Sequence, residues 1–161
     1  MSTDDPTLNF ITPRVAAGVL FTDDQDRVLM VVPSYKDYLD IPGGYVENGE
    51  TPHQAAQREV YEELGIKSPI GGLLVADWWE DSPEANGGAK LLLIFDGDQL
   101  DEAQMDDLRP DGNEVVGFEL IPQATIADRT ISRLANRIGY ALMARGAETM
   151  TYLENGLQAR Q

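Results

Sequence analysis

The chain contains 161 residues, a length that fits one globular domain spanning residues 1–161. Its 28 aspartate and glutamate residues outnumber its 12 lysines and arginines, and the formal net charge of -16 argues against long nucleic acid as a partner, because like charges repel. A hydrophobic fraction of 42% is enough for a packed core, and no apolar run approaches the roughly 20 residues that cross a bilayer, which argues against a membrane protein.

The amino-terminal residues and the cysteine count bear on location. Met1–Thr7 is polar and acidic, whereas a signal peptide needs a basic flank followed by an apolar stretch. The sequence contains no cysteine, so disulfides are excluded and the redox compartment is left open. We therefore predict a cytoplasmic protein.

The first half of the chain predicts a strand hairpin followed by a helix. Arg14–Thr22 and Arg27–Pro33 are rich in valine, leucine and methionine, and they flank a turn at Asp23–Asp26. After a break at Pro42–Gly44, the segment Thr51–Gly65 carries helix signals at both ends. It begins with a threonine N-cap, a proline and a capping box, and it closes on a glycine.

The second half predicts further strands and one amphipathic helix. Three strands, the helix and a short edge strand are expected at Ile70–Trp79, Lys90–Phe95, Val115–Ile121, Ile131–Ala144 and Met150–Leu153. A polar loop at Glu80–Gly88 joins the first two of these strands. Because strands and helices intermix without a regular βαβ alternation, the predicted fold class is α+β with a mixed β-sheet.

Three glutamates of the first helix share one face. At 100° per residue, Glu59, Glu62 and Glu63 occupy an arc of about 100°, beside an apolar stripe suited to packing on a sheet. Like charges three or four residues apart destabilise an isolated helix by roughly 0.2 to 0.5 kcal/mol per pair, so helix stability does not account for them. A hard divalent cation does, because Mg²⁺ takes oxygen ligands. The alternative is a solvated acidic face on which Arg58 pairs with Glu62.

The glutamates belong to a longer spaced pattern. Gly44 is followed after five residues by Glu50 and, after seven more, by the run Arg58-Glu59-Val60-x-Glu62-Glu63-x-Gly65-Ile66. This pattern resembles the Nudix box at every specified position between Gly44 and Ile66. The upstream hairpin, the proline before the paired glycines and a later loop with carboxylates are also similar to that family.

The resemblance implies a fold, a cofactor and a set of ligands. The fold is a Nudix-type α/β/α sandwich, in which a mixed sheet lies between helices. Mg²⁺ is the implied cofactor, and Mn²⁺ should substitute because both ions accept oxygen-rich octahedral sites. The implied ligands are Glu59, Glu62, Glu63 and a backbone carbonyl of Gly43 or Gly44. Glu50 and Arg58 are expected to form a salt bridge that holds the loop against the helix.

The resemblance also implies a reaction, the hydrolysis of a diphosphate bond by water. The expected substrate is a nucleoside diphosphate linked to another group, such as ADP-ribose, a nucleotide sugar, a dinucleoside polyphosphate or a nucleoside triphosphate. Glu62 and Glu63 are expected to act in catalysis, and the proton acceptor is either Glu63 or Glu114, which lies in a late turn-rich loop. In that loop, Asp111 beside Gly112 is expected only to make a turn.

A second interpretation is kept open. The chain could be a catalytically idle Nudix domain that senses a nucleotide ligand, although the intact set of box glutamates disfavours this role. A small nucleotide-type molecule is the expected partner under either interpretation. The chain could also form a homodimer.

Four residues outside the box are candidate substrate contacts. Arg14 could clamp a phosphate, and Tyr35 belongs to a polar, aromatic segment expected near the mouth of the site. Trp78 and Trp79 end a strand and precede a loop. Because adjacent strand residues point to opposite faces, one of these rings is expected in the core while the other could stack on a base.

Other polar residues are assigned to ordinary surface roles. His53, the single histidine, falls in the first turn of the box helix and is expected to be exposed. Arg129, Arg133 and Arg137 recur four residues apart beside the apolar stripe of the later helix. They could meet a phosphate, but we expect them on a solvated helix face.

Overall fold

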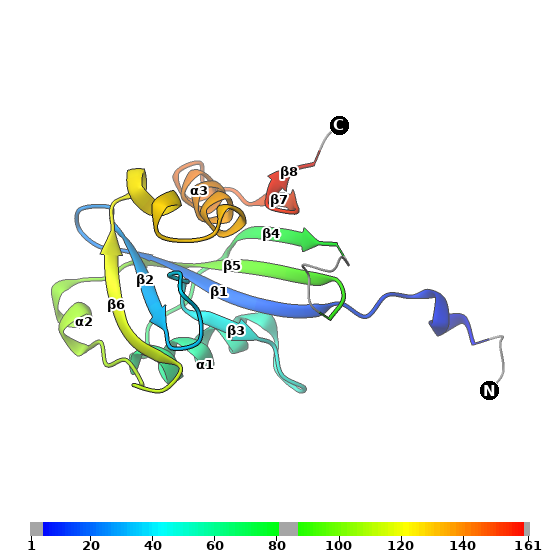
Figure 1. Ribbon diagram of the computed structural model, residues 1–161, viewed down its shortest axis with the longest axis horizontal. Helices are drawn as coiled ribbons and strands as arrows, with labels where there is room; N and C mark the ends of the chain where they lie inside the picture. Colours follow the sequence, from blue (N-terminus) through cyan, green and yellow to red (C-terminus); the bar gives the residue numbers. More distant parts are fainter. Residues whose placement is uncertain (1–4, 81–86, 160–161) are drawn as a thin grey trace.

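The computed structural model describes residues 5–80 and 87–159 of the chain (Figure 1). The expected loop at Glu80–Gly88 lies mostly outside these residues. The helices are the 3₁₀ turns η1 (Pro6–Asn9) and η3 (Gln123–Asp128) and the α-helices α1 (Pro52–Leu64), α2 (Glu102–Asp107) and α3 (Ser132–Gly146). The strands are β1 (Arg14–Thr22), β2 (Val28–Pro33), β3 (Gly43–Tyr45), β4 (Leu73–Trp79), β5 (Lys90–Gln99), β6 (Val115–Ile121), β7 (Thr151–Glu154) and β8 (Leu157–Gln158).

All of these strands belong to one mixed sheet. Its order is β6-β2-β1-β5-β4-β7-β8, and β3 pairs with β1 beside this path. The pairs β1–β5 and β4–β7 are parallel, whereas the other pairs are antiparallel. The predicted α+β class with a mixed sheet is therefore confirmed.

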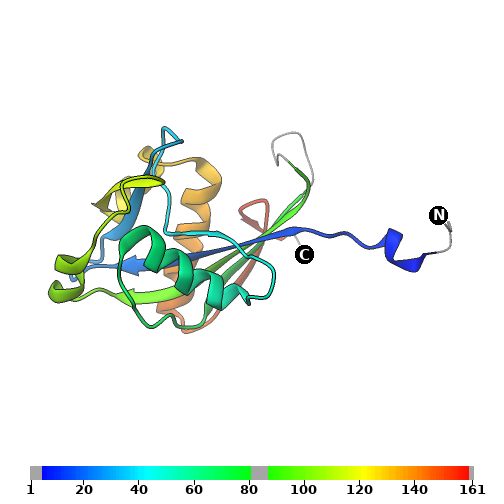
Figure 2. The ribbon, with the colours of Figure 1, turned by 90° about the horizontal axis from the view of Figure 1, so that it is seen from below.

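Helices cover both faces of the sheet, so the predicted α/β/α sandwich is also confirmed. In Figure 1, α1 lies on one side of the sheet and α3 on the other, and Figure 2 shows α1 in front of the strands. The apolar side of α1 packs Ala56 and Val60 into one buried cluster, and α3 packs Leu134 and Ile138 into a second. The segment before β1 extends away from this body (Figures 1 and 2).

The ends of α1 follow the signals in its sequence. The Thr51 side chain accepts a hydrogen bond from the Gln54 backbone, and the Gln54 side chain accepts one from the Thr51 N–H, which completes the predicted capping box. At the other end Gly65 adopts a φ of 72°, the left-handed conformation that a glycine enters at little cost. The predicted helix is thus confirmed with its caps.

Several predicted boundaries were wrong. Strand β5 continues to Gln99, beyond the predicted end at Phe95, because its second half remains paired to the end of β1. The expected break at the paired glycines contains the short strand β3. Helix α2 was not predicted, although Asp101 and Gln104 form the same kind of capping box as α1 has. Among the described residues, no helix is long and apolar enough to span a membrane.

A buried ion pair joins α3 to the sheet. Asp77 of β4 is fully buried and accepts hydrogen bonds from the Arg137 Nε and from the Gly156 N–H in the turn between β7 and β8. Arg137 itself is only 8% exposed. The expected solvated face is therefore wrong for Arg137, because an unpaired strand carboxylate would otherwise be buried opposite it.

The burial of this pair predicts that its loss lowers the free energy of unfolding more than the loss of an exposed arginine–carboxylate pair does. Asp77→Asn keeps the side-chain shape but leaves the Arg137 charge buried without compensation, and we expect it to lower the free energy of unfolding by about 3 kcal/mol. Glu119→Gln is the matched control, since Glu119 pairs with Arg129 where both side chains are about 40% exposed. The control should cost less than about 1 kcal/mol. Urea unfolding measures both, and equal losses would contradict the assignment.

Candidate active site

The loop before α1 is held against β1 by its glycines. Strand β3 pairs Gly43 with Gly18 and Gly44 with Ala17. A Cβ on Gly43 would lie 2.4 Å from the Ala17 carbonyl oxygen, and a Cβ on Gly44 would lie 2.3 Å from an oxygen of Glu59. Side chains at these positions would therefore push the loop away from the sheet and from the helix glutamates.

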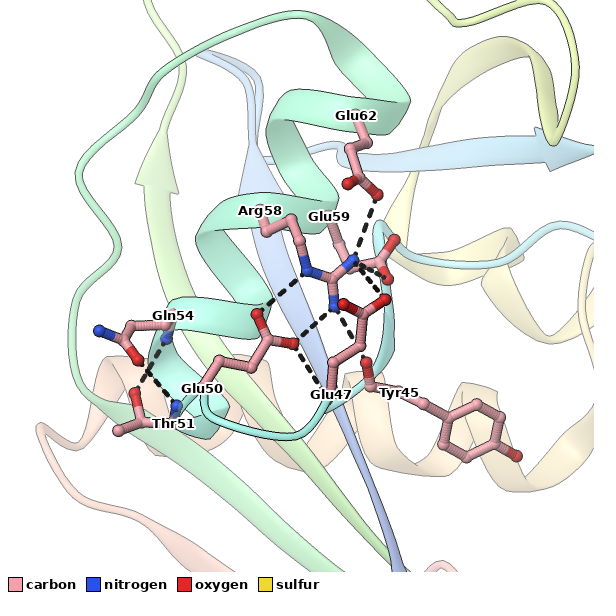
Figure 3. Close-up of polar contacts among 8 residues, drawn as sticks. All are labelled: Tyr45, Glu47, Glu50, Thr51, Gln54, Arg58, Glu59 and Glu62. Atoms are coloured by element: carbon pink, nitrogen blue, oxygen red, sulfur yellow. Dashed lines mark hydrogen bonds and ion pairs between the residues drawn. The ribbon is translucent and has the colours of Figure 1, made fainter.

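Arg58 ties this loop to α1, as Figure 3 shows. Its guanidinium donates to both carboxylate oxygens of Glu50, at 3.1 and 2.7 Å, and to the Tyr45 carbonyl at 3.0 Å. The same guanidinium donates to Glu59 at 2.8 Å and to Glu62 at 3.2 Å. The hydrogen bond to Glu50 is the main reason why the pKa of Arg58 is raised, and it lowers the pKa of Glu50 in return. With Glu47 at 3.9 Å, one cation thus offsets four carboxylates and orients the loop.

Glu63 makes no hydrogen bond with Arg58 and is buried. It is 7% exposed, and its carboxylate accepts a hydrogen bond from the Gly43 N–H at 3.1 Å. Burial raises the pKa of Glu63 to about 8, the Gly43 hydrogen bond opposes that rise, and the negative charges of Glu59, Asp40 and Glu114 add to it. Burial likewise raises the pKa of Glu59, against the effect of Arg58.

The loop that carries Glu114 is fastened to the end of α1. The Arg109 N–H donates to the Leu64 carbonyl, and the Asp111 N–H donates to the Glu63 carbonyl. The Glu114 carbonyl accepts from the Ser34 N–H at the end of β2. The exposed Glu114 side chain is consequently near enough for its charge to raise the pKa of both Glu59 and Glu63.

Asp111 differs from Glu114 in what its side chain does. One oxygen of Asp111 accepts hydrogen bonds from the backbone N–H groups of Asn113 and Val115, both at 2.9 Å. These bonds stabilise the charged carboxylate and lower its pKa. The expectation that Asp111 makes a turn is confirmed.

The carboxylates are the right kind of ligand for a divalent cation, but their side chains are not arranged around one position in this structure. Within residues 5–80 and 87–159, no three acidic or histidine side chains are gathered closely enough to hold a metal ion. Arg58 donates a hydrogen bond to each of Glu59 and Glu62, so both carboxylates are held by this cation (Figure 3). Rotation of these side chains away from Arg58, which would keep its two bonds to Glu50, would free oxygen ligands of the kind that Mg²⁺ prefers. Glu63 is buried with no salt-bridge partner among the described residues, as an acceptor of a cation would be.

A pocket opens beside the paired glycines. Its volume is about 310 Å³, and it lies between the sheet and the start of α3. Aromatic and basic side chains dominate the polar part of its lining: Tyr35, Lys36, Tyr38, Tyr45, Trp79, Lys90, Arg133 and Arg137. Gly43 and Gly44 line it as well, so the pocket begins where the glutamate cluster ends.

The four predicted substrate contacts are placed differently around this pocket. Tyr35 and Trp79 line it, whereas Trp78 and Arg14 do not. The Arg14 guanidinium instead lies over the Tyr45 ring, 5.0 Å from its centroid. The expectation that one tryptophan lies in the core was wrong, because both rings are only partly buried near the end of β4.

His53 was also misplaced by the sequence analysis. It is partly buried, its Nε2 lies 2.7 Å from the Ile70 carbonyl oxygen, and its ring packs edge-on against Phe95. The predicted exposed position was wrong because the segment after α1 folds back over the helix start. His53 is not part of the pocket lining.

The basic residues of the pocket were missed. Arg133 places its guanidinium over the Trp79 ring, 4.1 Å from the centroid, so its expected solvated position was also wrong. Arg137 and Lys90 come from α3 and β5. The four-residue spacing of the arginines was visible in the sequence, but only the strands opposite α3 reveal which of them face a pocket. Of these three arginines, only Arg129 is exposed as expected, and it lies before the start of α3, paired with Glu119.

Comparisons with known proteins agree with this geometry. The sequence model of the Nudix domain family matches residues 12–139, and the chain therefore belongs to the Nudix family. Diphosphoinositol polyphosphate phosphohydrolase 2 of Rattus norvegicus is 47% identical over 62 residues, which cover 38% of this chain and 35% of that protein. The match thus spans about a third of the length of this curated relative.

Solved structures show the same fold. The MutT protein from Methanosarcina mazei has a TM-score of 0.67 and 18% identity, with 86% of this chain and 98% of that chain covered. A UDP-X diphosphatase has a TM-score of 0.70 and 19% identity, with coverage of 92% and 70%. At these identities the likeness concerns the arrangement of the backbone.

The Arg58 network predicts that removal of the Arg58 side chain lowers the thermal stability of the chain. Arg58→Ala deletes the partner of Glu50 and leaves Glu59 and Glu62 facing each other, so we expect the melting temperature to fall by at least about 3 °C. Arg129→Ala removes an equally charged but more exposed side chain, and its melting temperature should stay close to that of the unaltered chain. Similar melting curves for both variants would show that the loop does not depend on Arg58.

The raised pKa of Glu63 predicts a pH-dependent stability of the metal-free protein. The protonated form is favoured in the fold, so its stabilising contribution is present below the unfolded pKa of about 4.5 and is lost as the pH rises through about 8. Glu63→Gln stays neutral throughout, and its amide oxygen can still accept from Gly43. In EDTA, the melting temperature of this variant relative to the unaltered chain should rise by at least about 3 °C between pH 6 and pH 9.

The control for this measurement is Glu47→Gln, because the Glu47 side chain is 71% exposed. The difference in melting temperature between Glu47→Gln and the unaltered chain should stay constant over the same pH interval. A flat difference for Glu63→Gln as well would mean that Glu63 is ionised at little cost in the fold.

Proposed function

We propose that this chain is a divalent-metal-dependent hydrolase that cleaves a phosphoanhydride bond in a nucleoside diphosphate linked to another group. The observation that carries the proposal is the meeting of two unlike regions at Gly43 and Gly44. On one side lies the buried carboxylate of Glu63 with its neighbouring glutamates. On the other side lies a pocket rich in aromatic and basic side chains. A molecule with a diphosphate next to an aromatic base suits both regions.

The glutamates are proposed to hold the metal. Glu59, Glu62 and Glu63, with a carbonyl of Gly43 or Gly44, supply oxygen ligands, and Mg²⁺ or Mn²⁺ are the ions that such sets accept. Nudix hydrolases generally use divalent metals. The cation would neutralise charge on the two bridged phosphates and make water a better nucleophile. The roles of Glu50 and Arg58 are to keep the loop and helix in register around it.

Glu114 is proposed as the proton acceptor. Glu63 is held by the Gly43 N–H and is a metal ligand in this proposal, and a carboxylate bound to a cation is a weak base. The Glu114 side chain is exposed, makes no salt bridge among the described residues, and acts electrostatically on both Glu59 and Glu63. It can therefore approach a water molecule at the edge of the cluster and remove its proton.

The pocket is proposed to hold the nucleoside. Trp79 and Tyr35 each have one ring face covered by a cation, Arg133 or Lys36, and the opposite face of either ring would let a base stack. Proteins of the same fold include a UDP-X diphosphatase and an ADP-ribose pyrophosphatase from Streptococcus suis. The activities that these two names state support a substrate in which a nucleoside diphosphate carries a second group.

A panel of nucleotide derivatives tests the proposal directly. The purified chain with Mg²⁺ should hydrolyse at least one member of a panel containing ADP-ribose, nucleotide sugars, dinucleoside polyphosphates and nucleoside triphosphates, with products followed by chromatography. Excess EDTA should abolish turnover, because clustered carboxylates without metal repel a diphosphate, and Mn²⁺ should restore it. Turnover in EDTA would rule out the metal. If a folded, metal-binding protein hydrolyses no compound of the panel, the result would favour a nucleotide sensor instead.

A second prediction separates the two late-loop carboxylates. Glu114→Gln should lower kcat by roughly 10² to 10⁴, the range typical for loss of a general base. Asp111→Asn is the matched control, because the amide oxygen can still accept the turn hydrogen bonds, and its kcat should change little. Turnover of Glu114→Gln equal to that of the unaltered chain, at saturating substrate and metal, would leave Glu63 as the base.

A further inference from the structure

The described lining of the pocket is positively charged, whereas the chain as a whole is negatively charged. Among residues 5–80 and 87–159, its lining contains four basic residues, Lys36, Lys90, Arg133 and Arg137, but one acidic residue, Asp40. Four positive charges and one negative charge give a net charge of +3 for the lining, in a chain whose formal net charge is -16. Such a reversal concentrates anions at one place on an otherwise repulsive surface.

Two of these four cations are already balanced by carboxylates. Lys36 pairs with Asp40 at 2.6 Å, and Arg137 pairs with Asp77 through its Nε. Arg133 and Lys90 form no salt bridge with any residue of the described ranges 5–80 and 87–159. They lie instead over the rings of Trp79 and Tyr45, at 4.1 and 6.0 Å from the centroids. About two positive charges are therefore left for a ligand.

Arg137 adds hydrogen-bond donors to these charges. It is more than nine-tenths buried and lines the pocket, but only its Nε donates to a partner among the described residues. Its two Nη nitrogens form no hydrogen bond with any residue of the ranges 5–80 and 87–159. A planar pair of N–H donors of this kind matches two oxygens of a phosphate.

The start of α3 points to the same chemistry. The helix has 15 residues, its N-cap is Ile131, which has no side chain able to cap it, and its first turn contains no acidic residue. Ile131, Arg133 and Leu134 line the pocket. The first backbone N–H groups of a helix carry partial positive charge and bind anions when no side chain satisfies them.

We infer that the α3 end of this pocket binds a second phosphate group of the substrate, separate from the diphosphate that is hydrolysed at the glutamates. The inference deepens the proposed function and rests on it for the position of the first diphosphate. The phosphate is either a monoester on the nucleoside that occupies the pocket or the distal part of a longer polyphosphate chain. A single phosphate group of about -1.5 to -2 charges matches the two uncompensated cations, whereas a ring that carries many phosphates does not.

Phosphate binding can be measured without catalysis. The metal-free chain in EDTA is titrated with inorganic phosphate at constant ionic strength, and NMR follows the backbone amides of Ser132, Arg133 and Leu134. We expect saturable chemical-shift changes at these amides. The phosphate affinity derived from them should fall at least about tenfold in Arg133→Leu, which removes the charge but can still cover Trp79. Arg129→Leu is the matched control, since Arg129 lies just before α3 and outside the pocket lining, and its titration should follow that of the unaltered chain.

Two substrate pairs then identify the source of the phosphate. The ratio of kcat/KM is compared for ADP-ribose 2′-phosphate against ADP-ribose, and for diadenosine tetraphosphate against diadenosine diphosphate. A ratio above about 10 in the first pair indicates a monoester, and in the second pair a longer chain. Either preference should fall toward 1 in Arg133→Leu and persist in Arg129→Leu.

The outcomes separate this inference from the proposed function. The absence of saturable shifts, or equal shifts in Arg133→Leu and the unaltered chain, overturns the inference. Hydrolysis without preference in either pair overturns it too and leaves the proposed function intact. If no member of either pair is hydrolysed, the titration alone decides the inference, because it does not depend on catalysis.

Discussion

Mutual repulsion among the carboxylates on and around α1 is the constraint on which the site depends. Glu59, Glu62 and Glu63 share one helix face, and Glu114 approaches from a loop fastened to the end of that helix. Arg58 relieves part of the repulsion by hydrogen bonds to Glu59 and Glu62. Burial and the nearby negative charges raise the pKa of Glu63 to about 8, which makes this position a place for a proton or a cation.

The backbone of the paired glycines separates this acidic cluster from a region of opposite character. The Gly43 N–H holds Glu63 on one side, and on the other side Gly43 and Gly44 line the pocket that ends at α3. Strand β3, which contains both glycines, is paired to β1 and fixes the position where the two regions meet. A substrate with a diphosphate at one end and a base at the other would have each part met by complementary chemistry.

Local signals in the sequence predicted the features whose residues lie within a short stretch of the chain. The capping box of Thr51 and Gln54, the left-handed Gly65 and the common face of the box glutamates follow from residues fewer than about five positions apart. The Glu50–Arg58 contact also lies within the box. Apolar runs between turn residues predicted the strands, and the intermixed order of strands and helices predicted the mixed α+β class, whereas the sheet between helices was implied by the Nudix resemblance.

Tertiary structure alone decided what lies between elements that are distant in sequence. Arg137 is buried because Asp77 lies opposite it, 60 positions earlier, and Arg133 faces a pocket because Trp79 ends the strand beneath it. The docking of the Glu114 loop depends on the Leu64 and Glu63 carbonyls that end α1. Sequence spacing fixes which residues share a helix face, but it contains no information on which strand that face meets. The sequence by itself therefore determined the acidic half of the site, and only the packing of α3 on the sheet determined the basic, aromatic half.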